Sequence, residues 1–144
     1  GKALQMINIL RDIPEDLDFG RCYIPLNRLK EVGLNPIELR DTSNHEKFIP
    51  IYQSLLDITQ GHLDAAEEYI QMLPVTQIRL KIACLLPVLI GQKTVNLLRT
   101  CEILDSSKRV KVPRKVVKRL MIRCILSTMI PGGTKRLLKK NRTK

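Results

Sequence analysis

Apolar residues recur along this chain at the spacing of α-helices. The longest such stretch runs from Asn44 to Leu73, where apolar positions follow an i, i+3, i+4 pattern and the acidic residues lie largely off that stripe. Similar apolar stripes predict helices over residues 1–13, 76–101 and 112–129. The segment 76–101 is apolar on most sides through its middle, which is typical of a helix at the centre of a bundle. The pattern therefore predicts an all-α fold.

Proline and glycine residues separate these predicted helices. Residues 14–25 interrupt the helical pattern and predict a loop. Pro87 removes one backbone donor from the central helix and predicts a kink there. Pro131-Gly132-Gly133 ends the last helix. We therefore expect one helical domain over residues 1–131, followed by a basic, flexible and poorly ordered tail over residues 132–144.

The composition agrees with a helical protein of modest size. The chain has 144 residues, of which 44% are hydrophobic and only 3% aromatic, so we expect one domain with an aliphatic core. The longest apolar run, Ile82 to Ile90, is shorter than the roughly 20 residues that span a bilayer. The four cysteines lack the close spacing of a zinc or redox motif, which indicates reduced thiols. These features predict a soluble, cytoplasmic protein.

A row of polar side chains lies near the start of the chain. Asn8, Asp12 and Asp16 are spaced at i, i+4 and i+8, and on a helix this spacing stacks them along one face. Gln5 and Arg11 flank them. Oxygen ligands of this kind suit Mg²⁺, which takes one or two protein carboxylates and fills its other positions with water and phosphate oxygens. Taken alone, two aspartates four residues apart are also typical of a solvated helix face, and a proline between them argues against a fully regular helix.

The residues around this polar row are more specific than the two aspartates. The run A-L-Q-M-I-N-I-L-R-D-I-P-E-D occupies Ala3 to Asp16, and G-R-C-Y-I-P follows at Gly20 to Pro25. Together they resemble the second aspartate-rich motif and the adjoining loop of squalene and phytoene synthases. The resemblance implies the C-terminal helices of an isoprenoid (terpenoid) synthase-type helical bundle, present here in incomplete form.

The resemblance also implies a reaction and roles for individual residues. Enzymes of this family condense two prenyl diphosphates, farnesyl or geranylgeranyl diphosphate, head to head. Asn8, Asp12 and Asp16 match the positions that hold Mg²⁺, and the two aspartates would be catalytic because the metal assists the departure of diphosphate. The positions that line the diphosphate are matched by Gln5, Arg11, Arg21 and Tyr23. The run V-K-V-P-R-K at residues 110–115 is similar, apart from an inserted proline, to a basic stretch near the cofactor or diphosphate side of eukaryotic squalene synthases. NADPH use is therefore left open.

One feature of the family has no counterpart in this sequence. Family members carry an earlier aspartate-rich motif on a helix that faces the second one, and no such segment occurs before Asn8 or after Asp16. We therefore expect this chain to supply one wall of the active site and to be inactive alone. The alternative is a noncatalytic, truncated relative that retains the binding of diphosphate or of a partner.

The charge of the chain supports a third hypothesis. All 14 acidic residues and 11 of the 25 basic residues lie in residues 1–105, so the other 14 basic residues lie in 106–144 without a single acid. Such a segment attracts polyanions. With five aromatic residues, no zinc ligands and no recognised nucleic-acid-binding motif, we expect no binding of nucleic acid. We interpret the basic tail as a peripheral contact with anionic membrane, and a general polyanion-binding module is the alternative.

Overall fold

The fold is entirely helical over the residues that the structure describes. The structure, a computed structural model, describes residues 1–107 and 109–142. Within these ranges it contains the helices α1 (Lys2–Arg11), α2 (Ile13–Asp18), α3 (Leu26–Glu31), α4 (His45–Met72), α5 (Ile78–Leu98), α6 (Arg114–Thr128) and α7 (Gly133–Arg142), with 3₁₀ turns at Glu38–Arg40 and Thr42–Asn44. No strand occurs in these two ranges. The predicted all-α fold is therefore confirmed.

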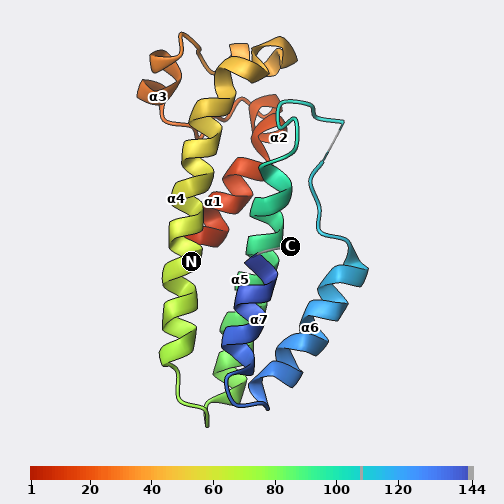
Figure 1. Cartoon of the computed structure of the whole chain (residues 1–144). Helices are drawn as coiled ribbons and strands as arrows, with labels where there is room; N and C mark the ends of the chain where they lie inside the picture. Colours follow the sequence, from red (N-terminus) through yellow and green to blue (C-terminus); the bar gives the residue numbers. More distant parts are fainter. Residues whose placement is uncertain (108, 143–144) are drawn as a thin grey trace.

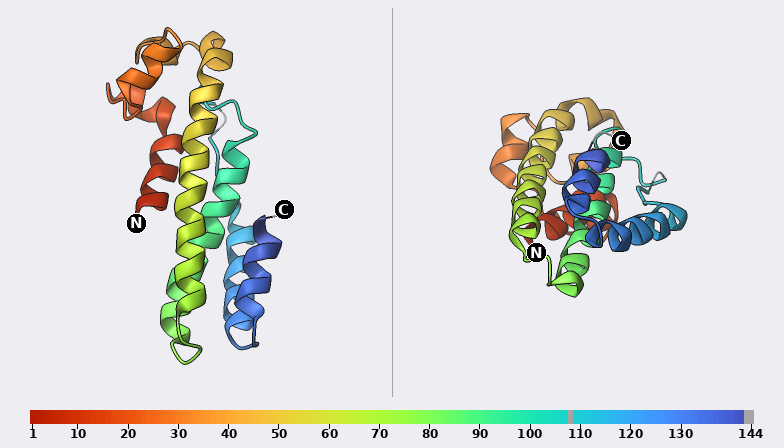
Figure 2. Two further views of the ribbon diagram at one scale, coloured as in Figure 1. Left: turned by 60° about the vertical axis from the view of Figure 1, so that its left-hand side comes forward. Right: turned by 60° about the horizontal axis from the view of Figure 1, so that its bottom comes forward.

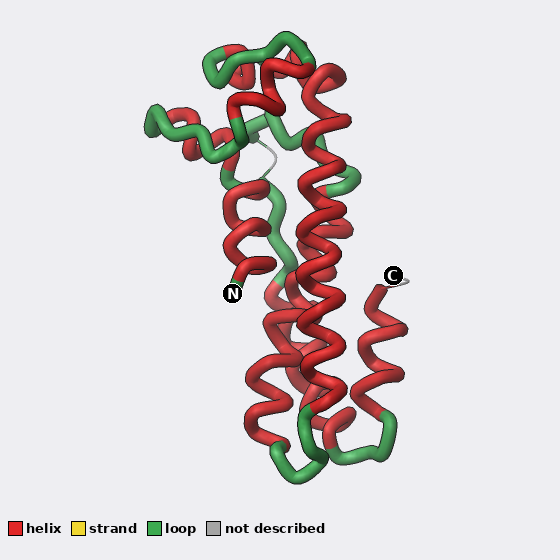
Figure 3. The backbone as a smooth tube through the Cα atoms, turned by 90° about the vertical axis from the view of Figure 1, so that its left-hand side faces the viewer, coloured by secondary structure: helices red, strands yellow, loops and turns green. Residues whose placement is uncertain are grey.

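Two long helices, α4 and α5, run side by side along the length of the molecule (Figure 1). The short helix α1 packs against both of them, while α6 and α7 pack against α5 and against each other. The helices α2 and α3 and the 3₁₀ turns lie at the end where α4 begins (Figure 2). The α4–α5 turn and the α6–α7 turn both lie at the opposite end (Figure 3). The helix α2, which begins next to Asp12, and these two turns therefore lie toward opposite ends of the bundle.

The core between α1, α4 and α5 is built almost wholly from aliphatic side chains. α4, a helix of 28 residues, contributes apolar side chains to it from Phe48 near its start to Ile70 near its end, because these positions fall on one helical stripe. Phe48 and Tyr52 form the aromatic pair of this core, with ring centroids 5.7 Å apart. The prediction of an aliphatic core is confirmed, and the stripe on α4 explains why this helix forms the long wall of the bundle.

The central helix α5 is apolar on nearly all sides. It has 21 residues and is long and apolar enough to cross a membrane if judged by length and composition alone. In the bundle it contacts four helices, and Leu85, Leu89 and Val95 are fully buried among them. The same composition is expected of a helix that other helices surround. The packing of α5 among other helices therefore explains why its sequence is so apolar.

The C-terminal segment corrects one expectation from the sequence. Residues 132–144 were expected to form a flexible tail, but Gly133–Arg142 form the helix α7. Leu137 and Leu138 are buried against the bundle, with exposed fractions of 9% and 1%. The expectation of a flexible tail is therefore wrong for α7, because its few apolar side chains fall on one helical face and find a partner surface on α5. Residues 143–144 lie outside the described residues.

Polar contacts also attach α7 to α4 and α5. The Asn141 side-chain amide donates to the Leu89 carbonyl at 3.0 Å and to Gln92 Oε1 at 2.6 Å. Arg142 pairs with Asp64 and Glu67, and the Gln92 amide donates to Glu67 as well. Burial raises the pKa of the Glu67 carboxyl. The bonds from Asn141 and Arg142 form only while α7 is docked, so α7 is an integral part of the bundle.

Candidate active site

The predicted first helix breaks at Asp12. α1 ends at Arg11 and α2 begins at Ile13, so the predicted loop over residues 14–25 contains a short helix. Pro14 has no N–H and cannot donate to the carbonyl of Leu10, four residues earlier. The buried hydroxyl of Tyr52 on α4 donates to that carbonyl at 3.2 Å instead. The break therefore follows from the proline, and α4 satisfies the group that the proline leaves open.

We expect Tyr52→Phe to destabilise the chain by about 1–3 kcal/mol, because the buried Leu10 carbonyl would lose its hydrogen-bond donor. Urea unfolding followed by circular dichroism measures the change. The matched control is Tyr69→Phe, since Tyr69 lies on the same helix with its side chain half exposed. Equal unfolding free energies for the two variants would contradict a role of the Tyr52 hydroxyl in supporting the break.

The spacing of the polar row survives the break. The Asp12 N–H donates to the Asn8 carbonyl and the Asp16 N–H to the Asp12 carbonyl, both at 2.9 Å. These bonds have the i to i−4 pattern of an α-helix. Asn8, Asp12 and Asp16 therefore follow one another by one turn each, although they belong to two helical segments.

Asp12 is held in place by two arginines. Arg11 Nε donates to Asp12 Oδ1 at 2.8 Å and Arg11 Nη2 to Oδ2 at 2.6 Å, which is the forked geometry of a bidentate pair. Arg109 Nη2 lies 3.7 Å from Asp12 Oδ1, and Arg109 Nη1 lies 2.8 Å from Glu15 Oε1. The hydrogen bonds from Arg11 lower the pKa of Asp12. The Asp12 carboxylate is therefore charged and oriented, with two guanidinium groups beside it.

Arg109 is a site residue that the sequence reasoning missed. It lies in the connection between α5 and α6, far from Asp12 along the chain. Its only signal in the sequence is that it directly precedes the basic run over residues 110–115. The connection between α5 and α6 brings Arg109 to α2. No local pattern in the sequence specifies this contact.

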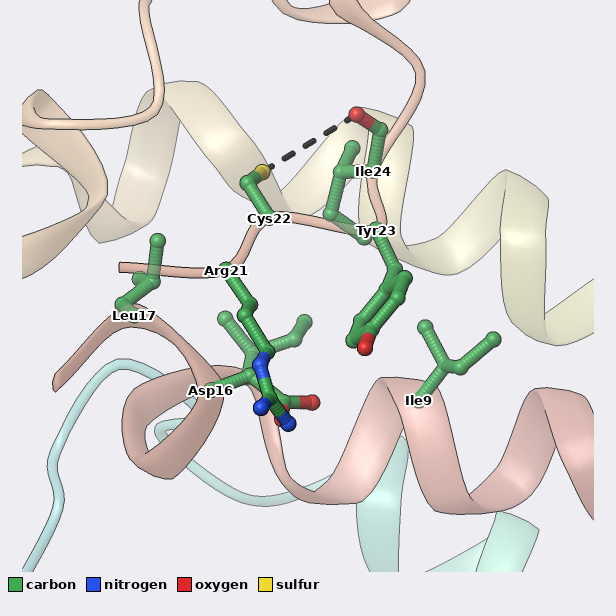
Figure 4. Close-up of a pocket in the computed structure, with 8 residues that line it drawn as sticks. Ile9, Asp16, Leu17, Arg21, Cys22, Tyr23 and Ile24 are labelled. Atoms are coloured by element: carbon green, nitrogen blue, oxygen red, sulfur yellow. Dashed lines mark hydrogen bonds between the residues drawn. The ribbon is translucent and has the colours of Figure 1, made fainter. Parts of the chain in front are cut away.

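A glycine turn places Arg21 next to Asp16. Gly20 has a φ of +71°, which favours glycine, and it ends α2. The Gly20 N–H donates to the Leu17 carbonyl at 2.9 Å and the Arg21 N–H to the Asp16 carbonyl at 2.8 Å. This pair of bonds is the Schellman motif of a helix C-terminus. The turn at Gly20 and Arg21 thus places the backbone of Arg21 against the last turn of α2. Figure 4 shows the Arg21 side chain extending toward the Asp16 carboxylate.

The predicted site residues are distributed over two neighbouring depressions. Asp16, Arg21 and Tyr23 line a narrow pocket together with Ile9, as Figure 4 shows. Arg11 lines a second pocket on the side of Arg109. Gln5 and Asn8 lie on the exposed face of α1. These two pockets lie on either side of α2, so the structure does not place the metal-binding row and its arginines around a single cavity.

The oxygen donors fit one half of a magnesium site. Within the described ranges, no group of three or more histidine, cysteine, aspartate or glutamate side chains is arranged to hold a metal. Mg²⁺ needs only one or two protein carboxylates when phosphate and water complete its shell. Asp12 and Asp16 can supply these, with the Asn8 amide oxygen one turn away. These donors therefore fit a Mg²⁺ ion whose remaining positions are filled by phosphate oxygens and water.

Comparison with known proteins identifies the family. The family model for squalene/phytoene synthase matches residues 1–116, from the start of the chain into α6. The chain belongs to the squalene/phytoene synthase family. This is a family of head-to-head prenyl transferases, and the resemblance inferred from the motif around Asp12 is confirmed.

Curated relatives match about half of this chain. It is 35% identical over 74 residues to presqualene diphosphate synthase of Zymomonas mobilis, covering 51% of this chain and 25% of that protein. It is 38% identical over 74 residues to the bifunctional lycopene cyclase/phytoene synthase of Arthroderma gypseum, covering 51% of this chain and 12% of that protein. It is also 35% identical over 74 residues to the 15-cis-phytoene synthase of Enterobacter agglomerans, covering 51% of this chain and 25% of that protein. The chain thus corresponds to a quarter or less of these relatives.

Proposed function

We propose that this chain forms one wall of the diphosphate site of a squalene/phytoene synthase-type transferase, which joins two prenyl diphosphates head to head. The observation that carries the proposal is the oriented Asp12 carboxylate, held by Arg11 and Arg109, next to the Asp16–Arg21 pocket. In a member of this family, the combination of hard oxygen ligands and forked cationic donors suits a metal–diphosphate group. Farnesyl or geranylgeranyl diphosphate is the proposed substrate class.

The proposed roles follow the chemistry of the leaving group. Asn8, Asp12 and Asp16 would hold Mg²⁺, which when bound acts as a Lewis acid on the departing diphosphate. The allylic C–O bond breaks with its electron pair on the diphosphate oxygen, and the carbon is left as a carbocation. The guanidinium groups of Arg11 and Arg21 would donate to the phosphate oxygens. Gln5 and Tyr23, at the edges of this region, would contact the same anion.

An apolar groove beside α1 suits the prenyl chain. It has a volume of about 310 Å³ and is lined by side chains of α1, α4 and α5, among them Leu4, Leu63 and Val88. Cys84, Pro87 and Val88 of this lining belong to the apolar run from Ile82 to Ile90. Such a wall would keep water from the carbocation. The groove lies at the start of α1 and Asp12 directly follows the end of this helix, so the prenyl chain would extend along α1 from the diphosphate.

The second wall of the site would come from a segment outside this chain. Acidic residues of α4 are the alternative source of carboxylates within the described ranges, but they pair with arginines. Asp57 pairs with Arg99, and both Asp64 and Glu67 pair with Arg142. This observation also favours the second candidate function, a noncatalytic relative that binds diphosphate. NADPH use, a cytoplasmic location and peripheral contact with anionic membrane are further proposals. The last is supported by the 14 basic residues after Asp105.

Two measurements separate these functions. An extended form carrying the upstream coding sequence is incubated with farnesyl or geranylgeranyl diphosphate and Mg²⁺, with and without NADPH, and the lipids are analysed. In parallel, titration calorimetry measures inorganic diphosphate binding to the 144-residue chain with and without Mg²⁺. We expect a head-to-head product from the extended form and Mg²⁺-dependent diphosphate binding by the chain. Binding without product supports the noncatalytic relative, and loss of both overturns the proposal.

A further inference from the structure

The end of the bundle away from Asp12 exposes apolar side chains on two adjacent turns. In the α4–α5 turn and its flanks, Met72 and Val75 are 77% and 78% exposed, and in the α6–α7 turn Met129 is 71% exposed. The flanking side chains Ile78 and Ile130 are also exposed. Both turns line one open groove, so they are neighbours in space (Figure 3). These five residues, Met72, Val75, Ile78, Met129 and Ile130, are called the apolar tip below.

The surroundings of the apolar tip are basic. The sequence contains no acidic residue from Tyr69 to Cys101 or from Ser106 to Lys144, and these two segments include both turns. Arg79 follows the first turn, Lys135 and Arg136 follow the second, and all three side chains are exposed. The apolar tip is therefore flanked by cations from both segments.

We propose that the apolar tip inserts into the interfacial region of an anionic lipid membrane, with Arg79, Lys135 and Arg136 at the level of the headgroups. Clustered apolar side chains on a protein surface mark contacts with proteins or membranes. Here the cluster projects from two turns, and its flanking charges are cationic except for Glu68, which lies one helical turn before Met72. Anionic bilayers attract this combination of apolar and cationic side chains. An anionic bilayer can bury the apolar side chains and pair its headgroups with the basic ones. Charge complementarity therefore favours a membrane over a protein partner.

This inference rests on the peripheral membrane contact named under the proposed function and assigns that contact to a defined surface, and it does not depend on catalysis. It also differs from a flexible basic tail as the membrane contact. α7 is docked on the bundle through Leu138, Asn141 and Arg142, so Lys135 and Arg136 are held next to the apolar tip. Binding through the tip directs the Asp12 site away from the lipid surface, since the two lie toward opposite ends of the bundle (Figure 1).

The chain contains no tryptophan, so a single introduced tryptophan reports on its own surroundings. Val75→Trp places the reporter on the apolar tip, and Ile37→Trp is the matched control because Ile37 is 77% exposed at the other end of the bundle. Each variant of the 144-residue chain is mixed with vesicles of phosphatidylcholine and phosphatidylglycerol. We expect a shift of the Val75→Trp emission to shorter wavelength and quenching by lipids with brominated acyl chains. The emission of Ile37→Trp should keep its wavelength and escape quenching.

A second pair of variants tests the energetic contribution of the tip. Val75→Ser should weaken binding to the same vesicles about tenfold relative to the unsubstituted chain, as expected for a buried aliphatic side chain. Ile37→Ser should bind as the unsubstituted chain does. An unshifted Val75→Trp emission, or equal losses for the two serine variants, would overturn the proposal and leave the apolar tip as a contact surface for a protein. Both positions are exposed, so circular dichroism should show unchanged folding.

Discussion

Asp12→Asn should lower the turnover of an extended enzyme, one that carries both walls of the site, by about 10²–10³-fold. This is the loss typical of removing one group that stabilises charge in the transition state. Arg11 holds the Asp12 carboxylate in a bidentate pair and thereby fixes its direction, and an amide has neither the charge nor the second acceptor oxygen. Steady-state kinetics over a range of Mg²⁺ concentrations measures the effect. In the 144-residue chain, the same substitution should weaken Mg²⁺-dependent diphosphate binding.

The control for this substitution is Asp18→Asn, which removes the same charge from an exposed position on α2. Its turnover should match that of the unsubstituted enzyme. Both variants should unfold with similar free energies, because partly exposed ion pairs such as Arg11–Asp12 contribute at most about 1 kcal/mol. Near-normal turnover of Asp12→Asn at saturating Mg²⁺ would contradict the role assigned to Asp12.

Leu138→Ala should destabilise the chain by about 2–5 kcal/mol, as large-to-small substitutions in a packed core do. Leu138 lies in the last helix, yet its side chain is 1% exposed, and it packs in the core of the bundle. The loss is a large fraction of the unfolding free energy of about 5–15 kcal/mol that small proteins have. Urea unfolding measures it.

Lys139→Ala is the matched control, since Lys139 is the next residue of α7 and its side chain is exposed. A surface substitution of this kind is expected to change the unfolding free energy by no more than about 0.5 kcal/mol. If both variants were equally stable, α7 would contribute nothing to the bundle, and the C-terminal segment would behave as the flexible tail that its composition suggests.

Much of the fold follows from periodicity that is visible in the sequence. The stripes that predict helices over residues 1–13, 44–73, 76–101 and 112–129 correspond to α1, α4, α5 and α6. They were predictable because burying one face of a helix requires apolar residues every three to four positions. The predicted bounds fail at Asp12, where Pro14 ends one helix and starts the next. α7 was missed because its composition is basic, although Leu137 and Leu138 still form an apolar face.

The candidate site was only partly predictable. The order of residues around Asp12 and in the G-R-C-Y-I-P run identified the family, and the family model confirms it. Backbone hydrogen bonds keep the spacing of Asn8, Asp12 and Asp16, so this part of the site is local. Arg109 was not predicted, because it reaches Asp12 only through the path of a long connection. The roles of the individual residues stay predictions.

The sequence by itself determined the helical class, the family and the local register of the metal-binding row. These properties depend on contacts between residues a few positions apart, which periodicity and turn residues record directly. Only the tertiary structure decided that Tyr52 supports the break before Pro14, that Arg109 lies beside Asp12 and that α7 docks on α5. Each of these joins residues far apart along the chain. Such contacts depend on how whole helices pack, and the pattern within one segment does not specify its partner.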